Sequence, residues 1–307
     1  MIARFNMSTL VLKSKNALDE SVEALDFTIY KQRVLADGGF IANEQAVKNA
    51  FQFCYQNNLT AAEVFSATSA NWGVKISGGK PKKLYTLFGE AGDIDITVGT
   101  PNSINYDTTS FSFPTIELKG SSTNGLKTKG VVSNVRSSGV FVIAKAPLLA
   151  TGAAYGSASG FALADLSDLS NSESGGVSLD KRMNVLFYSR QNSTETAESW
   201  TYSAYGYGLQ GQILTTGGLK NALAWNKAAT YLQANLMELI NNGAVYLNDT
   251  SVTEKQYINN LSFNIGRAKS SDVNTNYASP LYGHVAEAWC LVNTTSNKMK
   301  ALSMRTV

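Results

Sequence analysis

The chain has 307 residues and a formal net charge of +3, and only 16% of its residues are charged, against roughly 25% in an average soluble domain. Its lysines are scattered apart from one cluster at 80–83, so the composition argues against nucleic-acid binding, which needs several phosphate contacts on one face. Cys54 and Cys290 provide no disulfide framework, and we expect both to be buried free thiols.

The N-terminal stretch MIARFNMSTLVLKSK contains a short apolar run, TLVL, at 9–12. A signal peptide needs about seven apolar residues or more, and a membrane span needs about twenty. We therefore expect neither a signal peptide nor membrane insertion, and we expect folding in a reducing cytoplasm. The weak alternation over 8–13 predicts an edge strand.

Two helices are predicted next. Over 20–36, the spacing of Val22, Leu25, Ile29 and Arg33 predicts an amphipathic helix with one apolar stripe, and Gly38 and Gly39 supply its stop. The second helix is expected to begin at the N-cap Asn43 and to bury four residues at helical spacing: Val47, Ala50, Phe51 and Cys54. Because these helices are too few to form a core, we expect them to dock on a β body or on a neighbouring subunit.

From Trp72 onward, short apolar or alternating runs between Gly, Ser, Asn and Pro predict strands and indicate a sandwich or jelly roll. The predicted strands are 84–88, 93–98, 111–118, 139–146, 183–189, 199–205, 257–266 and 283–292. Asn242-Gly243 predicts a hairpin over 236–247, and Thr60 to Glu63 has the spacing of a capping box. The stretch 147–176 is interpreted as a long loop, and 296–304 as a short helix with Met299 and Leu302 facing inward.

The order of segments in this chain resembles that of a group of tailed-bacteriophage virion proteins. A helical lead containing YKQRVLADGG and NEQAVKNAF is followed by KKLYTLFGEAGDIDIT. SSTNGLKTKG is similar to their first jelly-roll strand. The last elements also follow an order similar to theirs: a hairpin at NNG, an inner strand at SFNIGRAK, an edge strand at HVAEAWCLV and then a final helix. In that group the final helix is usually longer than the residues after Thr295 allow.

The resemblance implies a mainly β fold: a concanavalin A-like or laminin-G-like jelly-roll sandwich over 66–307, preceded by a helical attachment element over 1–65. It also implies a structural role in the virion, in the tail, the baseplate or on the head surface, through contacts with other virion proteins and within a homo-oligomer. Under this hypothesis the protein is not an enzyme, has no cofactor or metal, and is assembled in the host cytoplasm.

Several short motifs have chemical interpretations that we set against structural ones. Gly206 to Gly211 spells GxGxxG, but the next residues, QILTTGG, predict no helix, as a dinucleotide site requires. Gly156 to Gly160 has Ala158 where a nucleophile elbow has Ser. Residues 272–276 begin like a calcium loop, yet Tyr277 replaces the required glycine, which leaves a looser oxygen-ligand site open.

Charged and aromatic residues leave two alternatives open. Asp93 and Asp95 alternate on one predicted strand and, with Glu117, suggest glycoside hydrolysis, although solvent-facing carboxylates opposite lysines are the simpler interpretation. His284, the one histidine, is expected to be structural. The densest aromatic cluster could be core, a subunit interface, or a site that contacts a host surface glycan; its members are Trp200, Tyr202, Tyr205 and Tyr207.

Overall fold

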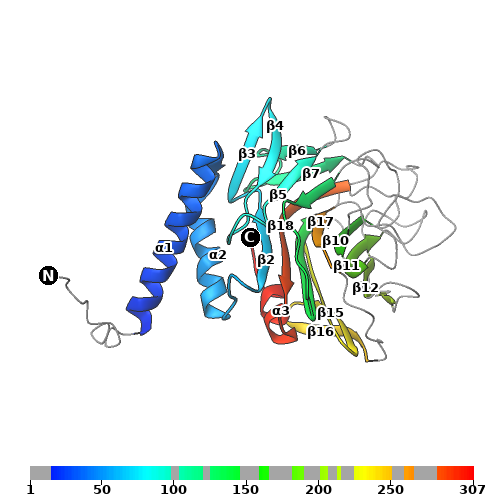
Figure 1. The fold of residues 1–307 in the computed structure, drawn as a ribbon. Coiled ribbons are helices and arrows are strands. Elements are labelled where there is room, and N and C mark those ends of the chain that lie inside the picture. The colour runs from blue at the N-terminus through cyan, green and yellow to red at the C-terminus, as the bar shows by residue number, and fades with distance from the viewer. Residues whose placement is uncertain are drawn as a thin grey trace.

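The computed structural model describes residues 15–97, 104–119, 125–145, 159–165, 182–189, 201–206, 213–215, 225–250, 259–265 and 282–307. The fold is a sandwich of two antiparallel sheets with helices beside it (Figure 1). This is the mainly β, jelly-roll class that the sequence predicts. The edge strand predicted over 8–13 lies outside the described residues.

The first sheet, sheet A, has ten strands within the described chain. In spatial order they are β1 (Phe40–Ile41), β3 (Gly73–Ser77), β4 (Lys80–Leu84), β5 (Ile94–Thr97), β8 (Gly125–Thr128), β17 (Leu261–Ile265), β10 (Ser159–Asp165), β11 (Arg182–Ser189), β12 (Thr201–Gly206) and β13 (Ile213–Thr215).

The second sheet, sheet B, faces sheet A. Its strands, in spatial order, are β16 (Ala244–Asp249), β15 (Leu236–Asn241), β14 (Asn226–Gln233), β9 (Ser137–Lys145), β18 (Tyr282–Val292), β7 (Thr115–Lys119) and β6 (Ile104–Asp107), and β2 (Val64–Ser69) also pairs with β18.

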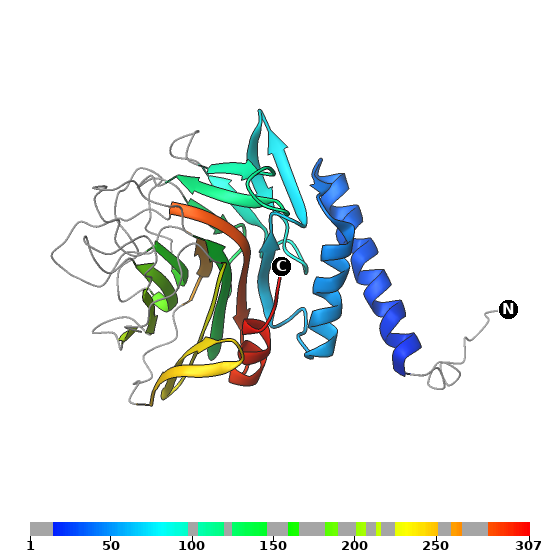
Figure 2. The ribbon, with the colours of Figure 1, turned by 180° about the vertical axis from the view of Figure 1, so that it is seen from behind.

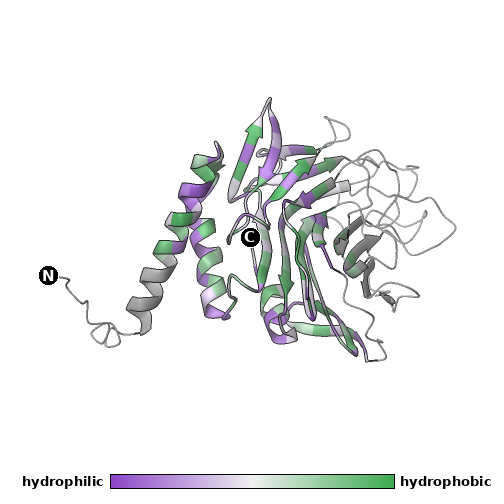
Figure 3. Ribbon diagram, in the orientation of Figure 1, coloured by the Kyte–Doolittle hydropathy of each residue, from purple (hydrophilic) through white to green (hydrophobic). Residues whose placement is uncertain are grey.

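Alternation along the strands divides the apolar residues of sheet B between two cores. Val140 and Val142 of β9 join the core between the sheets, with Phe161 and Phe263 of sheet A. Phe141 points the other way, into a second core beneath the helices. Figure 3 shows the corresponding mixture of apolar and polar bands along the strands.

Three helices cover or flank the outer face of sheet B: α1 (Lys15–Ala36), α2 (Glu44–Gln56) and α3 (Ser296–Ser303). The second core that they share with the sheet contains Tyr30, Phe51, Trp72, Trp289 and Met299. Figures 1 and 2 show α1 as the outermost element, with α2 between it and the sandwich.

The predicted helix signals are largely confirmed. Asn43 caps α2 by accepting a hydrogen bond from the Ala46 amide at 3.1 Å, and all four predicted positions of α2 are buried. Gly38 ends α1 in the left-handed region, at φ +76°, which glycine adopts without strain. In α3, Met299 and Leu302 are fully buried as expected.

The prediction of one apolar stripe on α1 is wrong. Leu25 and Ile29 of the predicted stripe are 58% and 53% exposed, while Phe27, Tyr30 and Val34 on the opposite side are buried. The spacing of the aliphatic residues does not reveal the buried face, because two of its members, Phe27 and Tyr30, are aromatic. The helix therefore has apolar residues on two faces.

Some strand predictions also need correction. A strand was predicted over 84–88, but the observed strand β4 ends at Leu84. Beyond it, the Thr86 amide donates to Asp93 Oδ1, and the Thr86 hydroxyl accepts a hydrogen bond from the Ala67 amide. The predicted loop 147–176 contains β10, and strands β2 and β14 were missed. HVAEAWCLV was compared to an edge strand, yet β18 lies between β9 on one side and β7 and β2 on the other.

The Asn-Gly hairpin is confirmed. Strands β15 and β16 pair across Asn242 and Gly243, whose φ values are +49° and +80°. Positive φ at both central residues is the geometry of a type I′ turn, whose twist matches that of paired strands. The capping-box residues Thr60 and Glu63 also bond as predicted, with the Thr60 amide 3.1 Å from Glu63 Oε2.

Candidate functional site

Of the predicted aromatic cluster, Trp200 and Tyr207 lie outside the described residues. Tyr202 and Tyr205 belong to β12, where they stand opposite Tyr188 and Val185 of β11. Their assignment to core, interface or glycan contact stays a prediction.

The glycine-rich and calcium-like motifs fall mostly outside the described chain. Gly206 is the last residue of β12, and residues 207–212, which include the rest of the GxGxxG motif, lie outside the described residues, so the structural role of these glycines stays a prediction. Residues 156–158 of the elbow-like motif and residues 272–276 are outside the described residues.

The paired carboxylates have a different setting from the one predicted. Asp93 is 2% exposed, and its two oxygens accept hydrogen bonds from Arg33 Nη1 at 2.7 and 2.8 Å. The amide of Thr86 also donates to Asp93, at 2.9 Å. The expectation of a solvent-facing carboxylate is therefore wrong for Asp93, which ties α1 to sheet A. Asp95 stands opposite Lys83 and Lys127 in the sheet register.

His284 has the contacts of a structural histidine. Its Nδ1 lies 3.0 Å from Thr115 Oγ1 and 3.7 Å from Asp107 Oδ2, and the Phe111 ring meets it edge-on. Burial alone would raise the pKa of Asp107, but hydrogen bonds from Ser110 and Thr109 outweigh it and lower that pKa to about 2. Asp107 therefore stays ionised beside His284 at neutral pH.

Cys54 and Cys290 are buried free thiols, as the sequence predicts. Burial raises the pKa of the Cys54 thiol to about 12 and raises that of Cys290 further. Neither thiol is activated for nucleophilic or redox chemistry, because reactivity depends on the thiolate.

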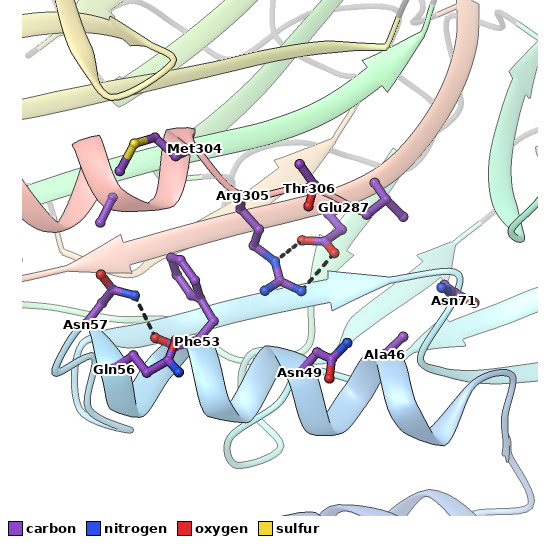
Figure 4. Close-up of a pocket in the computed structure, with 12 residues that line it drawn as sticks. Ala46, Asn49, Phe53, Gln56, Asn57, Asn71, Glu287, Met304, Arg305 and Thr306 are labelled. Atoms are coloured by element: carbon purple, nitrogen blue, oxygen red, sulfur yellow. Dashed lines mark hydrogen bonds and ion pairs between the residues drawn. The ribbon is translucent and has the colours of Figure 1, made fainter.

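A pocket of about 440 Å³ opens between α2 and the segment that follows α3 (Figure 4). We call it the α2 pocket. It is lined by Ala46, Asn49, Phe53, Gln56, Asn57, Asn71, Glu287, Ala301, Met304, Arg305, Thr306 and Val307.

One wall of the α2 pocket contains a buried ion pair. Arg305 donates from Nε to Glu287 Oε2 at 2.6 Å and from Nη2 to Oε1 at 3.1 Å. Three aromatic rings surround the guanidinium, those of Phe53, Trp72 and Trp289, with centroids 5.3 to 5.6 Å from Cζ. This pair was not predicted from the sequence, although a glutamate inside the apolar run VAEAWC is a signal for a buried partner.

Primary amides form much of the polar lining of the α2 pocket. Asn71 lines the pocket and is only 7% exposed. Asn49 accepts one bond, from Gln45 Nε2 at 2.8 Å, and Gln56 is exposed at the rim. Each amide offers both a donor and an acceptor to a neutral polar ligand.

The outer face of α1 is the second candidate site. By this name we mean the exposed residues Leu25, Thr28, Ile29, Gln32 and Ala36, which lie opposite the buried Phe27, Tyr30 and Val34. Leu35, at the margin of this face, is 52% exposed. An apolar helix face left in solvent is typical of a contact surface.

The described residues contain no group of three or more His, Cys, Asp or Glu side chains arranged to hold a metal ion. Among the helices of the described chain, none combines the length and the apolar character that a membrane crossing requires.

No protein-family model and no curated protein matches the chain. Similar solved structures include a heptameric SAP-like pentraxin from Limulus polyphemus, with 9% identity and a TM-score of 0.40, covering 58% of this chain and 75% of that one. Domain 4 of AbnA, a GH43 extracellular arabinanase from Geobacillus stearothermophilus in complex with arabinotriose, has 15% identity and a TM-score of 0.44, covering 78% and 98%.

A Trypanosoma rangeli sialidase in complex with sialic acid has 11% identity and a TM-score of 0.48, and the match covers 80% of this chain but only 33% of that one. At these identities the likeness concerns the fold alone. It says nothing of what this chain binds or does.

Proposed function

We propose that this protein is a structural component of a tailed-bacteriophage virion, in the tail, the baseplate or on the head surface, and that it acts through protein–protein contacts. The observation that carries the proposal is the outer face of α1, where Leu25 and Ile29 are more than half exposed. The resemblance of the helical lead and strand order to virion proteins supports the same role. In this proposal the chain catalyses no reaction.

The energetics favour covering this face. Burying a Leu or Ile side chain fully is worth about 1.5–3 kcal/mol relative to leaving it exposed. The opposite face of α1 is already packed against the rest of the chain. The Tyr30 hydroxyl donates a hydrogen bond to the Tyr85 carbonyl and accepts one from the Gly73 amide. A firmly seated helix with a second apolar face is suited to hold a neighbouring protein.

The test is to incorporate variants into the particle that carries this protein and to locate the chain by cryo-electron microscopy. We expect Leu25→Lys with Ile29→Lys to reduce incorporation severely, because two charges would be buried at the contact. Ala24→Lys, one residue away on α1, adds a charge beside the outer face and should leave incorporation normal. Full incorporation of the double variant, or density with the outer face of α1 in solvent, would contradict the proposal.

A second candidate is a glycan-binding module that recognises the host cell surface. The observation that favours it is the α2 pocket, whose volume of about 440 Å³ can hold a sugar ring. Asn49, Gln56 and Asn71 line this pocket with side-chain amides. Sugar hydroxyls both donate and accept hydrogen bonds, as these amides do. The sequence candidates Trp200, Tyr202, Tyr205 and Tyr207 offer a separate aromatic surface for the same function.

A glycan array with the intact protein distinguishes the two surfaces. Loss of binding in Asn49→Ala with Gln56→Ala would assign the glycan to the α2 pocket. Loss in Trp200→Ala with Tyr205→Ala would assign it to the aromatic cluster. If the protein binds neither the array nor intact host cells at high concentration, the glycan hypothesis is wrong.

A further inference from the structure

We propose that α1 pairs with α1 of a second copy of this chain, in a parallel two-stranded coiled coil whose seam contains Leu25 and Ile29. The inference rests on the proposed function, in which the outer face of α1 is a protein contact, and names the partner at that contact. Its experiment is chosen so that the two can fail separately.

Along α1, residues recur at the spacing of a coiled-coil seam. Leu18, Val22, Leu25, Ile29, Gln32 and Ala36 follow one another in the sequence at alternating steps of four and three residues. This is the heptad repeat of a coiled-coil seam, in which positions a and d recur every 3.5 residues on average. The helix is continuous over the whole repeat, because α1 spans Lys15–Ala36.

The described part of this repeat lies on the side of α1 that faces away from α2 and the sandwich. Leu25, Ile29, Gln32 and Ala36 are all exposed, whereas the body contacts come from Phe27, Tyr30 and Val34. In both views of the ribbon, no described element of the chain lies on the far side of α1 (Figures 1 and 2). A seam that its own chain leaves open is accessible to another helix.

The residue types at the seam positions favour a parallel pair. The steps place Val22 and Ile29 at position a, and Leu18 and Leu25 at position d. β-Branched residues at a with leucine at d favour parallel pairs over larger bundles. Gln32 is a polar residue at position d. A single polar residue at position a specifies the register of a coiled coil, and we expect Gln32 to act in the same way at position d.

The residues at heptad positions e and g, which flank the seam, are compatible with pairing between two copies of α1. In a parallel pair, residues at position g of one helix meet position e of the other, five residues further on. The e positions hold Asp26 and Arg33, which are bonded within their own chain to the Tyr55 hydroxyl and to Asp93, and the g positions facing them hold Ser21 and Thr28. Because the g positions Ser21, Thr28 and Leu35 are uncharged, no like charges are brought together.

The experiment measures the mass of the full chain by light scattering and sedimentation over a range of concentrations. A seam of about three heptads is short, so we expect a dimer that dissociates on dilution. Leu25→Lys should shift the equilibrium to monomer, by at least tenfold in dissociation constant. Ala24→Lys, which adds the same charge at the neighbouring exposed position outside the seam, should dimerise like the unmodified chain.

Orientation is tested by cross-linking. Only a parallel pair brings Leu25 next to Leu25 of the other copy, so Leu25→Cys should give a disulfide-linked dimer on mild oxidation. Ala24→Cys is the matched control, and the native Cys54 and Cys290 are buried and do not interfere. A dimer that dissociates with Leu25→Lys but gives no Leu25→Cys cross-link would overturn the parallel arrangement.

The outcomes separate this inference from the proposed function. A chain that stays monomeric at all concentrations overturns the coiled coil. If that monomer still needs Leu25 and Ile29 to enter the particle, the proposed function survives and the partner is a different virion protein. If Leu25→Lys neither dissociates a dimer nor affects incorporation, both are wrong.

Discussion

Arg305 and Glu287 form a buried, two-bonded ion pair that joins the end of the chain to the centre of sheet B. Their side chains are 8% and 2% exposed, and Glu287 Oε2 also accepts a hydrogen bond from Trp289 Nε1 at 3.0 Å. Because β18 carries Glu287 and α2 supplies the Phe53 ring against the guanidinium, this pair ties three elements together. It closes one wall of the α2 pocket (Figure 4).

Removing the carboxylate charge should therefore destabilise the fold strongly. Glu287→Gln leaves the Arg305 guanidinium buried without a counter-charge, and breaking such a pair costs about 3–5 kcal/mol. We expect urea unfolding to shift to a lower midpoint with an unchanged slope. The double variant Glu287→Leu with Arg305→Met should recover much of that loss, because it removes both charges. Equal losses in the single and double variants would contradict this account.

Asp37 should make stability depend on pH below neutrality. Hydrogen bonds from Lys83 Nζ at 2.7 Å, Tyr85 Oη at 2.8 Å and Lys75 Nζ at 3.0 Å lower the pKa of its carboxyl. In the unfolded chain that pKa is about 4. The stabilisation is therefore present above pH 4 and is lost as the pH falls from there towards the folded value.

We expect Asp37→Asn to lower the free energy of unfolding by about 1 kcal/mol at pH 7, a small value because Asp37 is partly exposed and solvent screens the interaction. The difference from the unmodified protein should shrink as the pH is lowered from about 5 to about 2. Glu90→Gln is the control, since its pair with Lys129 is largely exposed and should contribute little. A pH-independent difference would show that Asp37 acts by packing rather than by charge.

Gly139 and Met299 should be energetically coupled. A Cβ atom added at Gly139 of β9 would lie 2.1 Å from Met299 Sδ of α3, far inside van der Waals contact. Gly139→Ala should therefore cost about 1–3 kcal/mol by overpacking, and Met299→Ala about 2–5 kcal/mol by cavity formation. In the double variant the methyl group enters the space that Met299 leaves, so the loss should be smaller than the sum. Additive losses would contradict direct packing of α3 on β9.

The sequence predicts local structure better than it predicts how elements are placed. Asn43, Gly38 and the Asn242-Gly243 pair act within a few residues of themselves, so their caps and turn are confirmed. The position of β18 depends on pairing with β9, β7 and β2, which lie far away in the chain. No local pattern distinguishes a central strand from an edge strand in such a case.

The candidate site shows the same limit. On α1, Leu25 and Ile29 were identified as an apolar stripe from their spacing, but the buried face belongs to Phe27, Tyr30 and Val34. The choice between the two faces is made by Gly73 and Tyr85, which the Tyr30 hydroxyl contacts across more than forty residues of sequence. Likewise, the pairing of Glu287 with Arg305 joins a strand to a segment beyond the last helix, and neither residue indicates its partner.

Gln32 gives the last prediction, because a polar residue in a coiled-coil seam lowers stability while it fixes register. Gln32 is exposed on the outer face of α1, so Gln32→Leu should leave the monomer fold unchanged. We expect the variant to dimerise at least tenfold more tightly, since burying an additional Leu pair adds more than about 1.4 kcal/mol. We also expect it to lose register, so that the Leu25→Cys cross-link becomes less complete in a Gln32→Leu background. Sedimentation of Gln32→Leu measures the first effect, and cross-linking of Leu25→Cys with and without Gln32→Leu measures the second. An unchanged dissociation constant would show that Gln32 does not lie in the seam.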